Sequence, residues 1–232
     1  MKLRLCAIAL LAFAMTQSAA AQQNAVPVID GPTYLMTYVE VIPTAEAPAL
    51  SALKNYREAS RKESGAIRID LYQEQGQAHR FVLEEIWQNR AMAQDHAKGM
   101  AAAALVQKLK PIELGPPDIR THQIYSATPP KAPSPNDAIL ISHVDVAGGN
   151  TNNLIAQLNV LSEASRKENG MVRYEILDEV PAHSNHFRIV EEWASAAAWE
   201  AHDRAPHSQT YREAILPMLG TPYDQRLYRV VN

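Results

Sequence analysis

Hydrophobic and polar residues follow the same two spacings in both halves of the chain. Residues 67–71 place Ile67, Ile69 and Leu71 on one side and Arg68 and Asp70 on the other, which is the period of two expected for a strand. Apolar residues in 151–169 recur every three or four positions, which predicts a helix. The pattern in each half predicts the order strand, helix, strand, strand, helix, strand. The expected first strands are 34–41 and 139–146, the first helices 46–64 and 151–169, and the last strands 118–125 and 224–231.

The two halves are copies of one another. The segment Glu58–Glu63 recurs unchanged as Glu163–Glu168, 105 positions later, and the offset then becomes 106. This repeat, and the further matching residues that follow it in the same order, indicate a tandem duplication. Repeat one covers 33–125 and repeat two covers 138–232, and the four prolines in 126–137 predict an extended linker between them. Later shared residues are Phe81 and Phe187, Glu85 and Glu191, Trp87 and Trp193, and His96 and His202.

The first 21 residues have the composition of a secretory signal peptide. Lys2 and Arg4 precede an apolar run over 5–15, and small residues lead to an expected cut after Ala21. The run is too short for a stable membrane insertion. We therefore expect a periplasmic or secreted protein.

Composition excludes several classes of site. The single cysteine, Cys6, lies in the expected signal peptide, so the remaining chain has no disulfide, zinc–cysteine site or iron–sulfur cluster. The formal net charge of the 232 residues is −3, and there is no basic block. Such a chain is not expected to bind nucleic acid.

The motifs resemble the antibiotic biosynthesis monooxygenase (ABM) family. They are Ser-Arg-Lys-Glu-x-Gly, then Phe-x-x-x-Glu-x-Trp, then a His nine positions after the Trp. Repeat two is similar to the small bacterial quinol monooxygenases of that family in 190–193, 199–202, 205–207 and 211–214. The resemblance implies an α+β fold in which two ferredoxin-like βαββαβ repeats form an intramolecular dimeric α+β barrel.

The resemblance also implies an oxidoreductase that uses O2 and no bound cofactor. Its substrate would be a quinol-like or phenolic small molecule, whose anion can pass an electron directly to dioxygen. His202 would be the base, and Arg173 or Arg226 would stabilise the anion. Trp193 and Tyr174 would hold the ring. Repeat two is the expected active copy.

Other residues are also assigned to this candidate site. His143, His207 and Trp199 could contact the substrate, and His96, Trp87 and Tyr38 are the counterparts in repeat one. The tryptophans and histidines also have a purely structural interpretation, as core or hydrogen-bonding residues. Glu85 and Glu191 are expected to form structural ion pairs with arginines of their own repeats: Arg61, Arg68 or Arg120, and Arg166, Arg173 or Arg226.

Two alternatives remain open at this point. One is a non-catalytic barrel that binds a small molecule. The other is haem degradation, as in a neighbouring branch of the fold, but neither first strand contains the Asn used there. His183 and His186 are spaced like a metal pair but are assigned to a solvated turn, so no metal site is expected. Further association of the pseudo-dimer is not determined by the sequence.

Overall fold

The computed structural model describes residues 30–232 except 130 and 181–184, so the expected signal peptide lies outside the described residues. Each repeat contains four strands and three α-helices. In repeat one these are β1 (Thr33–Glu40), α1 (Glu46–Ser60), β2 (Ala66–Glu74), β3 (Arg80–Trp87), α2 (Arg90–Ala97), α3 (Met100–Leu109) and β4 (Asp118–Ser126). In repeat two they are β5 (Ala138–Asp145), α4 (Thr151–Ser165), β6 (Met171–Glu179), β7 (His186–Trp193), α5 (Ala196–Asp203), α6 (Pro206–Ile215) and β8 (Asp224–Val230).

The eight strands form one closed antiparallel barrel. Its order is β1-β3-β2-β8-β5-β7-β6-β4, with β4 returning to β1. The last strand of each repeat joins the two halves, because β4 pairs with β6 and β8 pairs with β2. The expected intramolecular α+β barrel is confirmed, and the exchange of last strands explains why the two halves form one body.

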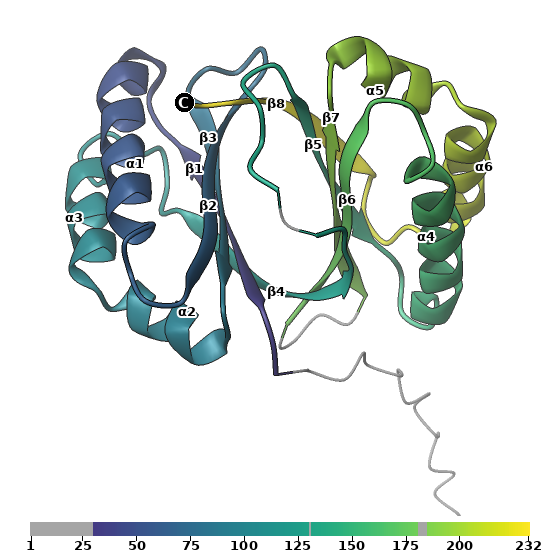
Figure 1. The fold of residues 1–232 in the computed structure, drawn as a ribbon, viewed down its shortest axis with the longest axis horizontal. Coiled ribbons are helices and arrows are strands. Elements are labelled where there is room, and N and C mark those ends of the chain that lie inside the picture. The colour runs from purple at the N-terminus through teal and green to yellow at the C-terminus, as the bar shows by residue number, and fades with distance from the viewer. Residues whose placement is uncertain (1–29, 130, 181–184) are drawn as a thin grey trace, which may run out of the picture.

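Helices cover the barrel on two opposite sides (Figure 1). The layer α1–α3 lies outside the sheet of repeat one, and the layer α4–α6 lies outside that of repeat two. One apolar core fills the space under each layer, built around Leu53 and Phe81 in repeat one and around Leu158 and Phe187 in repeat two. In these cores the apolar side of each helix packs against the apolar side of the sheet.

The barrel interior is a third core and contains charged residues. Tyr34, Met36, Tyr72 and Ile141 belong to its apolar part. Alternation along the strands also brings buried arginines and carboxylates inside, because every second residue of a barrel strand points inward. Strand alternation therefore separates two environments, one inside the barrel and one beneath the helices.

Local sequence signals explain the element boundaries. Asn89 and Ser195 cap α2 and α5, accepting hydrogen bonds from Met92 N at 3.0 Å and Ala198 N at 3.2 Å. Pro206 begins α6, as expected for a proline at the first helical position. The expected second helix is two pieces in both repeats, and in repeat one it restarts at Met100 without a proline.

The first helices are shorter than expected. They end at Ser60 and Ser165, four residues before the predicted ends. The chain then turns, and Gly65 and Gly170 adopt φ of 85° and 84° before the next strands begin. These glycines are required because this left-handed region is unfavourable for other residues.

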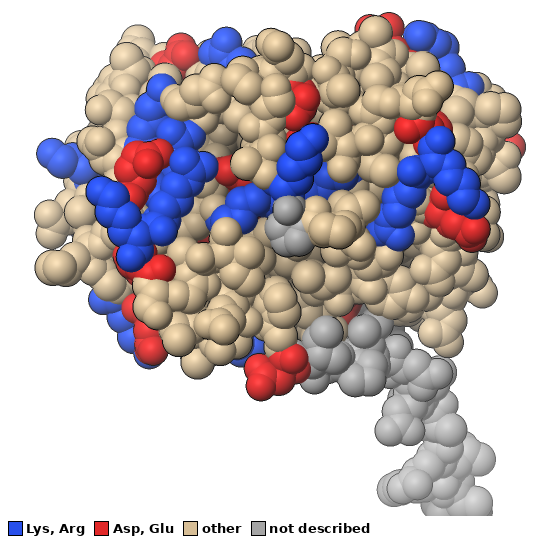
Figure 2. Space-filling model, viewed as in Figure 1, with Lys and Arg blue, Asp and Glu red and all other residues tan. Residues whose placement is uncertain are grey.

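The surface of the described part mixes both signs of charge. Figure 2 shows Lys and Arg side chains across one face with Asp and Glu beside them, rather than a block of one sign. No helix among the described residues is long and apolar enough to cross a membrane.

Candidate active site: paired Glu–His–Glu chains beneath the helices

A histidine stacks on a tryptophan beneath each helical layer. His96 on α2 lies 4.3 Å from Trp87, measured between ring centroids, and His202 on α5 lies 4.5 Å from Trp193. The interplanar angles are 25° and 28°. The rings are buried, so each histidine is fixed in position by the indole that ends β3 or β7.

A buried glutamate lies against each of these pairs. Glu85 Oε2 accepts a hydrogen bond from Trp87 Nε1 at 2.9 Å and lies 3.4 Å from His96 Nε2. Glu191 Oε2 accepts from Trp193 Nε1 at 2.9 Å and lies 3.5 Å from His202 Nε2. Burial raises the pKa of both carboxyls, although the neighbouring donors partly oppose that effect.

The second ring nitrogen of each histidine faces a more exposed glutamate. His96 Nδ1 lies 2.8 Å from Glu63 Oε2, and His202 Nδ1 lies 3.0 Å from Glu168 Oε1. The imidazole therefore connects a buried carboxylate with one near the surface. We call Glu85–His96–Glu63 and Glu191–His202–Glu168 the Glu–His–Glu chains.

The repeated Glu-Ala-Ser-Arg-Lys-Glu motif supplies the outer end of each chain. Its last residue is Glu63 or Glu168. Its arginines tie the end of the first helix to the neighbouring strand, because Arg61 Nε donates to Ile69 O and Arg166 Nη2 donates to Tyr174 O. The sequence analysis assigned no role to this last glutamate. Its presence at the same position in both repeats was the signal that could have identified it.

The two repeats differ around these chains. In repeat one Tyr56 Oη donates to Glu85 Oε1 at 2.7 Å and lies 2.6 Å from His96 Nε2. Repeat two has Leu161 at the matching position. Burial raises the pKa of the Tyr56 hydroxyl, so it remains a hydrogen-bond donor to the carboxylate. Tyr56 was not among the predicted site residues because repeat two lacks it.

A cavity of about 400 Å³ in repeat one reaches Tyr56. It lies between α1 and α3 and is mainly lined by small or apolar side chains. In repeat two, larger residues replace three of its α3 residues. They are His207 for Ala101, Thr210 for Ala104 and Tyr211 for Leu105. The lining residues are Pro48, Ser51, Ala52, Asn55, Tyr56, Ala59, Ala101, Ala104, Leu105 and Lys108.

The structure brings together part of the predicted site. Tyr174 meets the His202 ring edge-on at 6.2 Å between centroids, and the His207 ring lies 5.5 Å from that of His202. Trp193 completes this group. Trp199 is half-buried and packs against the small core cluster that contains Trp193.

Arg173 is placed elsewhere, inside the barrel. Its guanidinium donates to Glu84 at 2.9 and 3.0 Å, to Glu175 at 2.7 Å and to Glu192 at 3.0 Å. Strand alternation turns Arg173 and its neighbour Tyr174 to opposite faces of β6. Arg173 therefore does not lie beside His202.

The arginine partners expected for Glu85 and Glu191 are wrong. Glu85 is held by Tyr56, Trp87 and His96, while Arg68 turns into the barrel and pairs with Glu84 at 2.9 Å. The physical reason is the same alternation. Glu85 shares the helix-facing side with Phe81 and Leu83, whereas the Arg68 side of β2 faces inward. Arg173 likewise pairs with Glu192 instead of Glu191.

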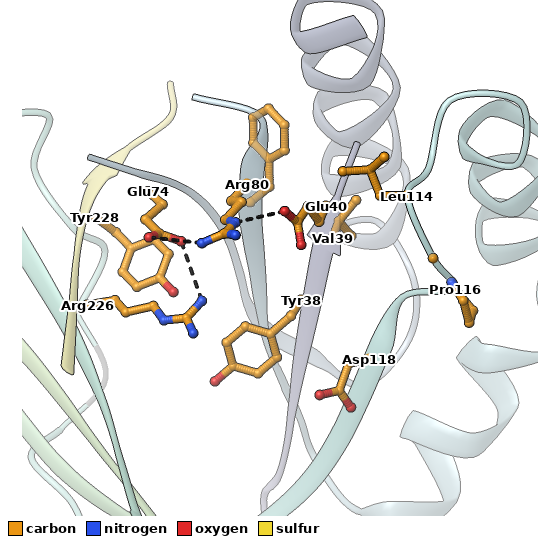
Figure 3. A pocket seen from close by; sticks show the side chains of 12 residues that line it. Tyr38, Val39, Glu40, Glu74, Arg80, Leu114, Pro116, Asp118, Arg226 and Tyr228 are labelled. Carbon is orange, nitrogen blue, oxygen red and sulfur yellow. Dashed lines mark hydrogen bonds and ion pairs between the residues drawn. The ribbon is translucent and has the colours of Figure 1, made fainter. Parts of the chain in front are cut away.

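The remaining predicted residues lie at another part of the barrel. Tyr38 and His143 are ring neighbours at 5.2 Å, and burial lowers the pKa of His143 to about 3. Tyr38 and Arg226 line a cavity of about 270 Å³ (Figure 3). There, Glu74 lies 3.6 Å from Arg226 and 3.8 Å from Arg80.

The histidine pair of the β6–β7 hairpin is only partly visible. His183 lies outside the described residues. His186 begins β7, and its Nδ1 lies 3.4 Å from Asp145 Oδ1.

Solved structures with the same fold cover most of the chain. A candidate monooxygenase from Fusobacterium nucleatum subsp. nucleatum ATCC 25586 has a TM-score of 0.78 at 15% identity, over 88% of this chain and 94% of that chain. One from Lactobacillus acidophilus NCFM has a TM-score of 0.69 at 15% identity, over 86% and 94%. An anthrone oxidase-like protein has a TM-score of 0.69 at 12% identity, over 89% and 95%.

At these identities the structures establish the fold alone. Among curated proteins, none matches the chain significantly. The model of the antibiotic biosynthesis monooxygenase family matches twice, over residues 32–108 and 138–214. These matches fall one on each repeat, and together they span more than half of the sequence. The chain belongs to the antibiotic biosynthesis monooxygenase family, as a tandem of two of its domains.

Proposed function

We propose that this protein oxidises a phenolic or quinol-like small molecule with O2, without a bound cofactor, in the cavity of repeat one. One observation carries the proposal. Tyr56 lines the cavity between α1 and α3, and its hydroxyl is hydrogen-bonded to both Glu85 and His96. An apolar site next to buried acid–base groups is suited to removing a proton from an aromatic substrate.

The cavity size suits a small ring system. Its volume of about 400 Å³ lies at the small end of the range for ligand pockets. Ala52, Ala104 and Leu105 offer apolar walls, and Asn55 and Lys108 offer polar groups. A flat molecule with one or two hydroxyl groups fits this combination of apolar walls and polar groups. The Lys108 ammonium would stabilise its anion.

Proton removal would proceed through repeat one's Glu–His–Glu chain. The substrate hydroxyl would give its proton to Tyr56 Oη while Tyr56 gives its own to Glu85. The raised pKa of Glu85 makes it a better proton acceptor than an ordinary carboxylate. His96 would then connect Glu85 with Glu63, whose side chain is 32% exposed. This route lets the proton reach solvent through Glu63.

The oxidation then balances without another reductant. The substrate anion passes one electron to O2, and the resulting radical and superoxide combine to form a carbon–oxygen bond. The peroxide formed takes up a proton and loses water when its ring carbon carries a hydrogen. One oxygen atom remains on the product as a carbonyl, the other leaves as water, and the substrate supplies all four electrons.

Repeat one is preferred over repeat two, contrary to the expectation from sequence. Repeat two keeps the Glu–His–Glu chain but has Leu161 in place of Tyr56. The buried Tyr211 also occupies the position that corresponds to Leu105. The role of His202 as a base is therefore not part of this proposal.

Oxygen consumption by matched variants tests the proposal. A panel of hydroquinones, naphthols and anthrone-like ketones is given to the wild type, Tyr56→Phe, His96→Gln and His202→Gln. We expect kcat to fall about 100-fold in Tyr56→Phe and His96→Gln but less than threefold in His202→Gln. Thermal unfolding of each variant checks that it is folded.

Two results would contradict the proposal. One is the absence of oxygen uptake with every member of the panel. The other is equal loss in His96→Gln and His202→Gln, which would show that repeat one has no special part. Selective loss in His202→Gln would instead favour repeat two.

A second candidate function, a non-catalytic small-molecule barrel, is supported by the cavity in Figure 3. Arg80 and Arg226 pair there with Glu74, and Tyr38 also lines the cavity, so it offers polar groups of both signs. Thermal stabilisation by small polar aromatics without oxygen uptake, lost in Arg226→Gln, would favour this function. In either case we propose export to the periplasm or beyond, on the basis of the composition of residues 1–21.

A further inference from the structure

We propose that repeat two binds one divalent transition-metal ion, of the Zn²⁺ type, through Glu168, His202 and His207. Their three ligand atoms all lie within 4.8 Å of one another. Two imidazoles and a carboxylate are a common zinc-binding set. This inference concerns repeat two and does not depend on the proposed oxidation in repeat one.

The three ligands come from different elements of the chain. Glu168 follows α4 in the turn before β6, His202 lies on α5, and His207 lies in the first turn of α6. The Glu168 Oε1 atom is 3.0 Å from His202 Nδ1 and is also in close contact with His207 Nε2. Ligand atoms around a tetrahedral zinc ion are about 3.4 Å apart, because each metal–ligand bond is about 2.1 Å. A small outward shift of the Glu168 carboxylate would admit the ion.

His202 is already oriented for this task. Its ring stacks on Trp193, and its Nε2 faces Glu191 Oε2 at 3.5 Å. A carboxylate on the second nitrogen is the usual support for a histidine ligand, since it fixes the ring and makes the metal-facing nitrogen more basic. Trp193 Nε1 holds that same oxygen of Glu191 at 2.9 Å.

His207 Nε2 contacts the Glu168 carboxylate without forming a well-directed hydrogen bond. That nitrogen is buried and has no hydrogen bond of suitable geometry elsewhere within the described part of the chain. Pro206 starts α6 and so fixes where the next residue, His207, is placed. The side chains of His207 and Glu168 are 25% and 21% exposed, which leaves a path for an ion and its water ligands.

Repeat one provides an internal comparison. Glu63 and His96 keep the same contact at 2.8 Å, but Ala101 stands where repeat two has His207. Two ligands alone give a hydrogen bond, and the third ligand makes a metal site. Binding of an ion at His202 Nδ1 would also take that nitrogen out of the Glu–His–Glu chain of repeat two.

Zinc titration of the full-length, untagged chain tests this assignment. Calorimetry follows Zn²⁺ alone, added to protein dialysed against a chelator, and Co²⁺ absorption reports the coordination number. We expect one ion per chain and at least a tenfold weaker affinity in His207→Ala and in Glu168→Gln. The control His186→Ala removes another carboxylate-paired histidine of repeat two and should bind as the wild type does.

A gain-of-site variant completes the experiment. Ala101→His adds the missing third ligand beside Glu63 and His96, and we expect it to raise the stoichiometry to two ions per chain. The assignment is overturned if the wild type binds less than half an ion per chain, or if His207→Ala binds as tightly as the wild type. Loss of the ion in His186→Ala, with retention in His207→Ala, would also overturn it. None of these results depends on oxygenase activity.

Discussion

Replacing Arg173 by Met should destabilise the barrel strongly and in a pH-dependent way. The guanidinium is fully buried and contacts Glu84, Glu175 and Glu192 at 2.7 to 3.0 Å. Removing one partner from a buried ion pair costs about 3–5 kcal/mol, because the remaining charge is left without compensation. We therefore expect a loss of about 4 kcal/mol at pH 8. That is a large part of the stability of a typical domain.

The pH dependence follows from the carboxyl groups. Burial raises the pKa of Glu192 to about 7, and Arg173 opposes this shift. A carboxyl whose folded-state pKa is raised binds more protons when folded, so its stability contribution is lost as the pH rises from about 4.5 through about 7. Without Arg173 the difference between the folded-state and unfolded-state pKa of Glu192 becomes larger. The variant should therefore lose stability with rising pH more steeply than the wild type.

Urea unfolding at pH 5 and pH 8 measures both effects. The control is Arg204→Met, because Arg204 is 69% exposed and lies 3.6 Å from Glu200. Such a surface pair contributes at most about 1 kcal/mol. A loss below 1 kcal/mol in Arg173→Met, or an equal loss at both pH values, would refute the reasoning.

Two further substitutions test the local signals of the fold. Gly170→Ala should cost about 2–3 kcal/mol in thermal unfolding, because φ is +84° and the new Cβ would lie 2.6 Å from Ala198 Cβ. In Gly76→Ala, where φ is +81° but no atom lies within 4 Å, we expect about 1 kcal/mol, and equal losses would exclude the contact as a cause. Asn89→Ala should cost about 1 kcal/mol in urea unfolding, since Met92 N loses its capping acceptor, and Asn89→Ser should recover most of it.

The sequence predicted much of the fold because the duplication doubles every signal. The caps at Asn89 and Ser195 appear in the structure where they were expected, and Ile69 and Leu71 face the helices as predicted. Ile67 does not share their buried face, because the strand has a bulge between Ala66 and Arg68 that leaves Ile67 46% exposed. The exchange of β4 and β8 was not predicted from local patterns. These strands pair across long stretches of chain, as between His122 and Glu179 or between Tyr72 and Val230, and the periodicity of one strand does not identify its neighbour.

The candidate site was predicted in part for a related reason. Shared residues directed attention to His202 and Trp193, which do lie together. Tyr56 was missed because it occurs in one repeat. Arg173 was grouped with His202 because both occur in the shared motifs, although the period of two along residues 172–176 already places Arg173 and Tyr174 on opposite faces.

Because the two halves are covalently linked, they can contribute different charged residues to the barrel interior. In a barrel made from two identical chains, an inward-facing Glu84 would be present twice, and the buried charge would double. Here the position related to Glu84 by the duplication is Val190, and the one related to Arg188 is Val82. A tandem gene can thus place one glutamate between the two related arginines, because Glu84 pairs with Arg68 of its own repeat and with Arg173 of the other.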